Sequence, residues 1–348
     1  MAHQSLYRAY RPQSFDEVVG QVQVTTPLAE AVRAKKIGHA YLFSGSRGLG
    51  KTSVARIFAK EIGCNERDVY EVDAASNNSV EDIRALTEGV YTLPFASPYK
   101  VYILDEVHML SKAAWNAFLK TLEEPPAHAV FILATTELEK VPETVQSRCQ
   151  VFEFKKPDRK GLAELVTKVA KQEGYTLDTD AAELVAMLAE GSYRDALSVL
   201  QRVLAGVSGK SLSREEVAQA TGAPRQEQVH ALISALAAGD RGSALAAIEN
   251  TAKSGVDLKL FLELVLDAMR AVLLIRYAPE LRASLASEYG KDEFATFSRL
   301  AESSQAQTNA HLTHDTLLAF LTASERIRYA PIPALPLELA VLELFPEF

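Results

Sequence analysis

The chain has 348 residues, of which 48% are apolar, and its formal net charge is −8. This length predicts two or three domains with sizeable cores, and the acidic balance excludes a protein that binds polyanions through its overall charge. There is no signal-peptide pattern and no apolar run near the roughly 18 residues that a membrane span needs, and two cysteines make no disulfide framework. We therefore expect a cytoplasmic protein, with any nucleic-acid contact confined to a local patch.

Residues 43–56, FSGSRGLGKTSVAR, have the glycine and lysine spacing of a phosphate-binding loop. An apolar strand pattern precedes the loop and a helical pattern follows it, as a P-loop requires. Glycines let backbone N–H groups turn toward phosphates, and the helix N-terminus adds partial positive charge. Lys51 should reach the β- and γ-phosphates, and Thr52 should offer its hydroxyl to Mg²⁺. The predicted nucleotide-binding residues of the loop are Gly45, Ser46, Arg47, Gly48, Leu49, Gly50, Lys51, Thr52 and Ser53.

Two acids end the next strand pattern, VYILDE at residues 101–106. A buried parallel strand places its terminal residues at the carboxyl edge of the sheet, where ligands bind in open α/β folds. Asp105 is predicted to bind Mg²⁺, through water, and Glu106 to orient and polarise the attacking water. Solvated acids that merely cap a strand are the alternative, and the P-loop upstream favours the functional interpretation.

A third strand pattern, AVFILATTE at residues 129–137, ends in two threonines level with Asp105. A hydroxyl there can hold the water or sense the γ-phosphate, and we favour Thr136 over Thr135. The helix predicted between these strands has Ser111 as its N-cap and Trp115 on its apolar face, and we expect it to be structural.

Two arginines further along lack an obvious structural purpose. Arg148 precedes the strand pattern VFEF, and two interpretations stay open: a finger aimed at a neighbouring subunit's γ-phosphate, or a surface arginine paired with an acid. Arg194 lies in the first turn of a predicted helix, where positive charge opposes the helix dipole. A bound anion would explain Arg194, and an ion pair with Asp195 or Glu190 is the alternative.

The order of patterns predicts an α/β P-loop domain with a parallel sheet and flanking helices over residues 1–157, followed by α-helical domains over 158–222 and 223–348. Ser213 and Glu216 form a capping box for a short helix in the second of these regions. The third is rich in leucine and alanine with helical periodicity, and it carries no catalytic constellation.

Several stretches together carry a family resemblance: YRAYRPQSFDEVVGQ, GSRGLGKT, DEVHMLSKAAWNAFLKTLEEPP, ATTELEKVPETVQSRCQ and GSYRDALS. They are similar to the γ/τ family of DNA polymerase III, the AAA+ ATPase subunits of bacterial clamp loaders. The resemblance is dense from residue 5 to about 205. It implies an AAA+ ATPase domain, a helical lid and a helical collar that holds subunits in a ring-like pentamer.

The resemblance also implies roles for particular residues. Arg148 would be the finger that acts in trans on the neighbouring subunit's ATP, and Arg194 would touch the γ-phosphate in cis. The N-terminal segment would lie near the adenine, through Tyr7, Arg11, Pro12, Val18 and Val19.

A DNA contact is implied at residues 73–86, DAASNNSVEDIRAL, which precede a predicted helix. Ser79 and Asp82 form a plausible capping box there, and a capped helix without a ligand is the alternative. In clamp loaders such helix N-termini hold DNA phosphates through N–H groups. The candidate DNA-binding residues are Ser76, Asn77, Asn78 and Ser79.

One departure from the family concerns zinc. Family members usually carry a four-cysteine module after the P-loop helix, whereas GCNERDVYEVDAAS here keeps only Cys64. A zinc site needs about four ligands. We therefore predict ATP and Mg²⁺ as cofactors and no zinc.

The resemblance predicts an ATPase subunit of the DNA polymerase III clamp loader, which opens the sliding clamp and loads it onto primed template DNA. Its expected partners are the other loader subunits (δ, δ′), further copies of itself, the β clamp and primer-template DNA. A longer C-terminal form would add the polymerase, since the chain stops at Phe348. A closed-ring DNA motor and a non-hydrolysing scaffold subunit are the alternatives; the long helices after residue 226 disfavour the first, and the intact Lys51 and Asp105 disfavour the second.

Overall fold

A computed structural model describes residues 4–207, 209–289, 291–306 and 311–345, and the chain divides into two units. The first comprises residues 1–162 and 189–198, and the second comprises residues 163–188 and 199–348. Each unit has its own hydrophobic core.

Five parallel strands form the sheet of the first unit, in the order β2-β3-β4-β1-β5. The central strands β1 and β4 are buried along their whole length, and β3 is buried up to its last residue, because both faces of the sheet are covered. This is the predicted α/β sheet with flanking helices. The strands are β1 (Ala40–Ser44), β2 (Val69–Asp73), β3 (Lys100–Asp105), β4 (Ala129–Thr135) and β5 (Gln150–Glu153).

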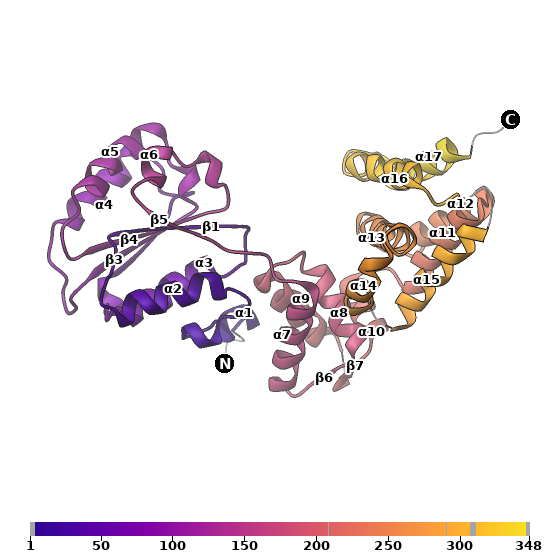
Figure 1. Cartoon of the computed structure of the whole chain (residues 1–348), viewed down its shortest axis with the longest axis horizontal. Helices are drawn as coiled ribbons and strands as arrows, with labels where there is room; N and C mark the ends of the chain where they lie inside the picture. Colours follow the sequence, from indigo (N-terminus) through magenta and orange to yellow (C-terminus); the bar gives the residue numbers. More distant parts are fainter. Residues whose placement is uncertain (1–3, 208, 290, 307–310, 346–348) are drawn as a thin grey trace. The chain divides into compact units, whose positions relative to one another are not determined.

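Alternate residues of the strands meet different helices, as the two-residue period of a strand requires. Tyr41 and Phe43 of β1 pack with α2 (Val22–Arg33) and α3 (Lys51–Glu61), below the sheet in Figure 1. Ala40 and Leu42 belong to the core on the other face, with α4 (Val80–Val90) and α5 (Lys112–Glu123). The P-loop helix α3 and the helices α4 and α5 thus cover opposite faces.

The local signals in the sequence of this unit are confirmed where helices begin. Ser79 and Asp82 form the capping box of α4, and Ser111 caps α5 by accepting the N–H of Ala114. Trp115 is buried in the core, as expected for a structural helix. The short elements of this unit are α1 (Leu6–Ala9), η1 (Phe15–Glu17), η2 (Glu66–Asp68), η3 (Val107–Met109), η4 (Leu138–Lys140) and α6 (Glu143–Gln146).

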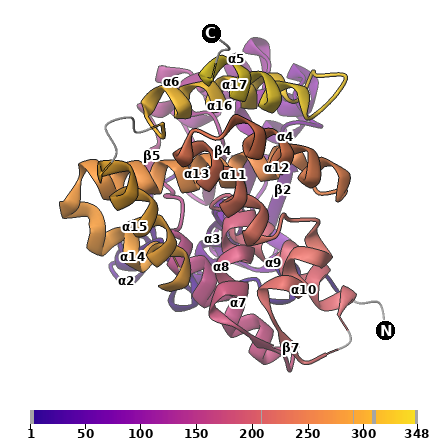
Figure 2. The ribbon, with the colours of Figure 1, turned by 90° about the vertical axis from the view of Figure 1, so that its right-hand side faces the viewer.

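The second unit is helical, with one short parallel pair of strands, β6 (Thr176–Leu177) and β7 (Ser211–Leu212), that the sequence patterns did not indicate. The predicted capping box of Ser213 and Glu216 is present at the start of α10. In Figures 1 and 2, α16 and α17 lie side by side. Two helices belong to both units: α7 (Arg159–Gln172) begins in the first unit, and α9 (Tyr193–Gly206) belongs to the first unit up to residue 198. The other helices of the second unit are α8 (Thr179–Leu188), α10 (Arg214–Thr221), α11 (Gln226–Ala238), α12 (Arg241–Lys253), α13 (Leu258–Tyr277), η5 (Pro279–Leu281), α14 (Arg282–Glu288), α15 (Lys291–Ala306), α16 (His314–Arg326) and α17 (Leu335–Leu344).

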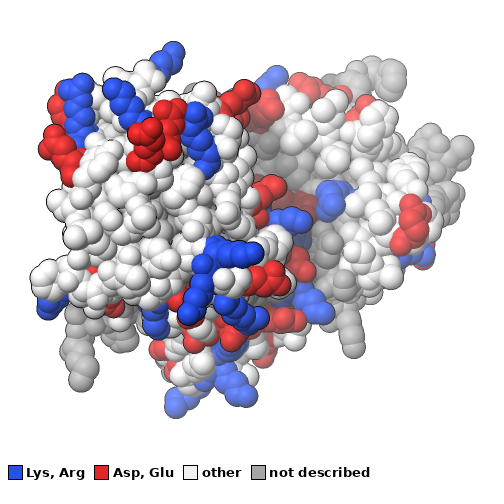
Figure 3. Space-filling model, turned by 60° about the vertical axis from the view of Figure 1, so that its left-hand side comes forward, with Lys and Arg blue, Asp and Glu red and all other residues white. Residues whose placement is uncertain are grey.

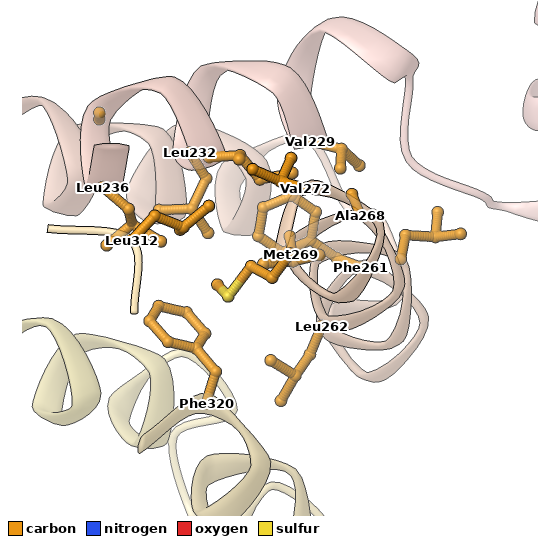
Figure 4. Close-up of a cluster of buried hydrophobic side chains, with 14 of the residues drawn as sticks. Val229, Leu232, Leu236, Phe261, Leu262, Ala268, Met269, Val272, Leu312 and Phe320 are labelled. Carbon is orange, nitrogen blue, oxygen red and sulfur yellow. The ribbon is translucent and has the colours of Figure 1, made fainter. Parts of the chain in front are cut away.

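The core of the second unit is built around α13, which buries side chains from most of its turns. Figure 4 shows Phe261 and Met269 of this helix between Leu232 of α11 and Phe320 of α16. Aliphatic and aromatic side chains fill the space between the helices, so this part of the chain can be stable without a ligand. Among the described residues, no helix is both long enough and apolar enough to cross a membrane.

Candidate active site

The P-loop connects β1 to α3 at the carboxyl edge of the sheet. Its glycines adopt conformations that other residues avoid, with φ of +136° at Gly45, +77° at Gly48 and +95° at Gly50. A Cβ at residue 48 would lie only 1.9 Å from the hydroxyl oxygen of Ser192. No atom lies within 4 Å of a Cβ built at Gly50, so the loop is open at this glycine.

Lys51 is the first residue of α3, and it is 6% exposed. Its ammonium group donates to the carbonyl oxygens of Gly45 and Ser46, the latter at 3.0 Å. Burial lowers the pKa of Lys51, and the negative charges of Glu106 and Asp105 oppose this effect only in part. No carboxylate of the described chain lies within ion-pair distance of it. A buried cation held by two carbonyl groups at the mouth of a glycine loop fits a polyphosphate ligand.

Three hydrogen bonds link predicted site residues at the start of α3, at the end of β3 and just after β4. The hydroxyl of Thr52 donates to Asp105 Oδ2 at 2.8 Å, and the hydroxyl of Thr136 donates to Glu106 Oε2 at 3.1 Å. The backbone N–H of Glu106 donates to Asp105 Oδ1 at 3.0 Å. The two acids at the end of β3 are therefore linked to the P-loop helix and to the end of β4.

Glu106 has an unusual backbone conformation for a non-glycine residue, with φ of +50° and ψ of +43°. Such a conformation costs about 1 kcal/mol or more and is found mainly where the surrounding structure enforces it. Its side chain is 30% exposed, so the carboxylate can reach water while its partner Thr136 holds one oxygen. Strain of this kind at a strand end is a further sign of a functional site.

The N-terminal segment and the start of α9 meet beside the P-loop. Arg11 donates from Nε to the hydroxyl of Ser53 at 2.9 Å, and the guanidinium of Arg194 lies 4.8 Å from the centre of the Tyr7 ring. Hydrogen bonds from Ser5 and Arg194 lower the pKa of Tyr7. In the described chain Arg194 makes no ion pair with Asp195 or Glu190, the two partners considered as the alternative to a bound anion, and its role stays a prediction.

The remaining residues predicted on the base side lie in the same segment. Val18 packs at the edge of the core that contains α3, whereas Val19 is 43% exposed. The backbone oxygen of Val19 accepts the hydroxyl of Tyr193 at 2.7 Å, which ties this segment to α9. Pro12 follows Arg11 directly in the chain.

Arg148 lies away from these groups in the hydrogen-bond network. It contacts Glu123 of α5 at 2.7 Å and donates to the backbone oxygen of Thr144 at 2.7 Å. The pair with an acid, which the sequence left as one alternative, is therefore present in the single chain. Both side chains are partly exposed, and such pairs stabilise a fold by only about 0 to 1 kcal/mol, so the guanidinium remains available to a stronger anion.

The predicted DNA-binding residues form the loop between β2 and α4. Ser76 donates to the carboxylate of Asp73 at 3.2 Å, and Asn77 donates to the backbone oxygen of the same residue at 2.9 Å. Ser79 caps α4 with Asp82. These polar groups satisfy one another locally, and the acids nearby oppose a phosphate, so a DNA contact at this loop stays a prediction.

Three residues that contact the site had not been singled out in the sequence. Ser192 and Tyr193 adjoin Arg194 and meet the P-loop, since the N–H of Tyr193 donates to the backbone oxygen of Gly48 at 3.1 Å. His108 contacts the end of β4, with its Nδ1 3.0 Å from the hydroxyl oxygen of Thr135. The histidine in DEVH was the one available signal for this last contact.

The donor set fits ATP and Mg²⁺. Mg²⁺ usually keeps several waters and takes one or two protein ligands together with phosphate oxygens, and Thr52 and Asp105 offer that number at hydrogen-bond distance from each other. In the described part of the chain, no group of three or more His, Cys, Asp and Glu side chains is arranged to hold a metal ion.

Comparison with known proteins places this site in a family. The model described as DNA polymerase III, delta subunit, matches residues 20–79 and 68–158. The model described as the ATPase lid domain of the DNA polymerase III clamp loader subunit matches residues 162–209. The model of domain III of the gamma and tau subunits matches residues 212–346. A DNA polymerase III subunit gamma from Buchnera aphidicola subsp. Baizongia pistaciae is 30% identical over 99% of this chain and 97% of its own length. The chain belongs to the γ/τ family of DNA polymerase III subunits.

Longer members of the γ/τ family match over the same region. The tau subunit of Bacillus subtilis is 38% identical over 99% of this chain, and that of Escherichia coli is 34% identical over 98% of it. The chain spans 63% and 55% of the lengths of these two relatives.

Solved structures confirm the fold class. Thermotoga maritima RuvB, described as a Holliday junction branch migration motor, superimposes with a TM-score of 0.53, covering 71% of this chain and 86% of the RuvB chain at 23% identity. At that identity the likeness shows the AAA+ fold alone.

Proposed function

We propose that this chain is the ATPase subunit of a DNA polymerase III clamp loader, and that ATP binding and hydrolysis drive the opening of the sliding clamp and its loading onto primed template DNA. The observation that carries the proposal is the pair of hydrogen bonds from Thr52 to Asp105 and from Thr136 to Glu106, beside the buried cation of Lys51. Membership in the γ/τ family supports the same role.

Bound ATP with Mg²⁺ would supply the reactive γ-phosphate and the charge that polarises it. Lys51 would hold phosphate oxygens, Thr52 would bind the ion through its hydroxyl, and Asp105 would bind it through water. Glu106 orients a water molecule and accepts its proton, while Thr136 keeps one carboxylate oxygen in place. Arg194, which has no acidic partner in the described chain, binds the γ-phosphate in cis.

The role proposed for Arg148 is in trans. Its contacts lie within its own chain, with Glu123 and Thr144, and none of them involves the P-loop. A guanidinium that neutralises charge on a neighbour's phosphate raises the hydrolysis rate by orders of magnitude. We therefore expect slow hydrolysis by the isolated chain and faster hydrolysis in an assembly.

The partners proposed are the other loader subunits (δ, δ′), further copies of this chain, the β clamp and primer-template DNA. On the face of the molecule shown in Figure 3, Lys and Arg side chains lie among Asp and Glu side chains rather than in one continuous basic surface. This mixture argues against DNA binding through overall charge, so the proposed DNA contact is a local one. The three-domain division, with a lid over residues 158–222 and a collar over 223–348, is part of the proposal.

Steady-state ATPase measurements test the proposal. The wild-type chain would be measured alone, then with the other loader subunits, and then with the sliding clamp and primed DNA. We expect a low rate alone and a sharp rise only when clamp and primed DNA are both present. Stimulation by any DNA without the clamp would instead indicate a motor, and no stimulation in any mixture would indicate a scaffold.

Two variants accompany that assay. Lys51→Ala should abolish ATP binding, because it removes the cation that reaches the phosphates. Arg148→Ala should keep ATP affinity and lose the stimulated rate. Tight ATP binding by Lys51→Ala would refute the assignment of the phosphate cradle.

A further inference from the structure

His108 lies between the two residues that flank Thr136 in the sequence. It belongs to η3, and its side chain is 8% exposed. Its Nδ1 makes a hydrogen bond of 3.0 Å with the hydroxyl of Thr135, and its Nε2 lies 3.3 Å from Glu137 Oε1. The imidazole therefore spans the turn whose central residue is Thr136.

Two groups contact the hydroxyl of Thr135 at this turn. The backbone N–H of Glu137 donates to the hydroxyl oxygen of Thr135 at 3.0 Å. The same hydroxyl oxygen lies at hydrogen-bond distance from Nδ1 of His108. The other ring nitrogen, Nε2, lies beside the Glu137 carboxylate. Side chain and backbone thus fix the end of β4 together.

The fixed turn matters because it carries the hydroxyl that binds Glu106. Thr136 donates to Glu106 Oε2 at 3.1 Å, and Nδ1 of His108 lies 3.4 Å from the same oxygen. In the described chain, Oε1 of Glu106 makes no hydrogen bond. One oxygen of the carboxylate is held and the other is left for a water molecule. A shift of the Thr136 turn would therefore shift the carboxylate.

We propose that His108 is a positioning residue for ATP hydrolysis, which acts by holding the turn at Thr136 and through it the carboxylate of Glu106. This inference rests on the proposed function of the chain. The charged groups around the ring are Glu106 and Glu137, and Glu137 is itself paired with Lys140 at 2.7 Å. His108 lies between these two carboxylates, and among the described residues it makes no hydrogen bond or ion pair with the P-loop, Thr52 or Asp105.

The first test uses the isolated, nucleotide-free chain and does not depend on activity. Hydrogen exchange would be followed in a peptide that covers residues 135–141. His108→Phe keeps an aromatic ring and removes both nitrogens, so we expect the N–H of Glu137 to exchange about fivefold faster. His128→Phe is the matched control, because His128 bonds to the backbone oxygen of Val90 and lies outside the site. Unchanged exchange in His108→Phe would overturn the proposal.

The second test uses the assembled loader with clamp and primed DNA. We expect His108→Phe to lower kcat about tenfold while ATP affinity stays within about twofold, since the residue does not contact the phosphate cradle. Thr136→Val, which keeps shape and loses the hydroxyl, should lower kcat to a similar degree. If His108 acts through Thr136, the double variant will be no slower than Thr136→Val alone. Independent, multiplicative losses would refute the proposed route.

Glu137→Ala provides a variant that keeps the fold if His108→Phe does not, because the Glu137 side chain is partly exposed, at 38%, whereas that of His108 is 8% exposed. It should lower kcat by several fold, whereas its control Lys140→Ala should not change kcat. Equal effects of these two variants would overturn the proposal. If the wild-type loader shows no stimulated hydrolysis, the proposed function fails with the inference; a stimulated wild type with an unaffected His108→Phe refutes the inference alone.

Discussion

Substitution of Gly48 by alanine tests the contact between the P-loop and the start of α9. The residue has φ of +77°, and an alanine Cβ would lie 1.9 Å from Oγ and 3.0 Å from Cβ of Ser192. The backbone conformation alone costs a non-glycine residue about 1 kcal/mol. Moving Ser192 away breaks the hydrogen bond of 3.2 Å from the N–H of Asp195, which adds about 1 kcal/mol. We expect the free energy of unfolding to fall by about 2 kcal/mol.

The assay is denaturant unfolding, with Gly63→Ala as the matched control. Gly63 also lies in the first unit and has φ of +84°, but the nearest atom to its added Cβ is Pro98 Cγ at 4.0 Å. That variant should lose only the conformational term, about 1 kcal/mol. ATP affinity adds a second readout: because the N–H of Tyr193 binds the oxygen of Gly48, displacing this turn moves Arg194, and we expect about a tenfold rise in Kd for Gly48→Ala.

Two results would refute this reasoning. Equal losses of unfolding free energy in Gly48→Ala and Gly63→Ala would show that the loop does not press on Ser192. An unchanged ATP affinity in Gly48→Ala would show that the contact does not control Arg194. Adding Ser192→Ala to Gly48→Ala removes Oγ of Ser192, the atom 1.9 Å from the added Cβ. The double variant should therefore lose less ATP affinity than Gly48→Ala alone.

Three further predictions use the titratable groups. Lys51→Met should raise the free energy of unfolding of the nucleotide-free chain by about 1 kcal/mol while abolishing ATP binding, because it removes a buried cation that lacks a carboxylate partner. Burial lowers the pKa of Lys51 in the folded chain below its value in the unfolded chain. The wild type without nucleotide should therefore gain stability relative to Lys51→Met as the pH rises through the folded pKa. Free energies of unfolding that depend on pH in the same way in both chains would contradict this. Burial raises the pKa of Cys149 to about 12 and also raises that of Cys64. At pH 8 neither thiol should therefore react with iodoacetamide in the folded chain, and both should react after unfolding. Mass spectrometry can follow the reaction. Burial first, and the charges of nearby arginines second, lower the pKa of His230, whose Nε2 has no hydrogen-bond partner in the described chain. The free energy of unfolding of the wild type minus that of His230→Leu should therefore fall as the pH drops below about 6.5. A difference that does not change with pH would contradict this.

The sequence predicted those parts of the site that depend on chain-local patterns. The glycine spacing placed Lys51 at the start of the helix after the loop, and the acids that end VYILDE placed Asp105 and Glu106 at a strand end. Parallel strands bring their carboxyl ends to one edge of the sheet. The capping boxes at Ser79 and Ser213 were equally predictable, because a cap and its partner lie three residues apart.

Contacts between distant segments could not be predicted in the same way. Arg148 pairs with Glu123, and no helical or strand periodicity in the sequence connects these two positions. The approach of Ser192 to Gly48 depends on how the chain returns from the second unit to the P-loop. The contact between Glu106 and Thr136, on which the proposed role of His108 rests, joins residues that follow β3 and β4, two strands that are paired over 100–104 and 129–133. In each case the partner is chosen by packing, so no single stretch contains the information.

The groups proposed to act in hydrolysis make polar contacts within the chain. Thr52 bonds to Asp105, Lys51 bonds to carbonyl groups of the loop, and Arg148 bonds to Glu123. The first two pairs can be released by a phosphate and an ion that bind within the same chain, because both partners face the same loop. Among the described residues, Arg148 contacts Glu123 and Thr144 and no residue of the P-loop. In the proposed trans role, Arg148 would complete the site only in a second subunit, and this requirement would couple hydrolysis to assembly.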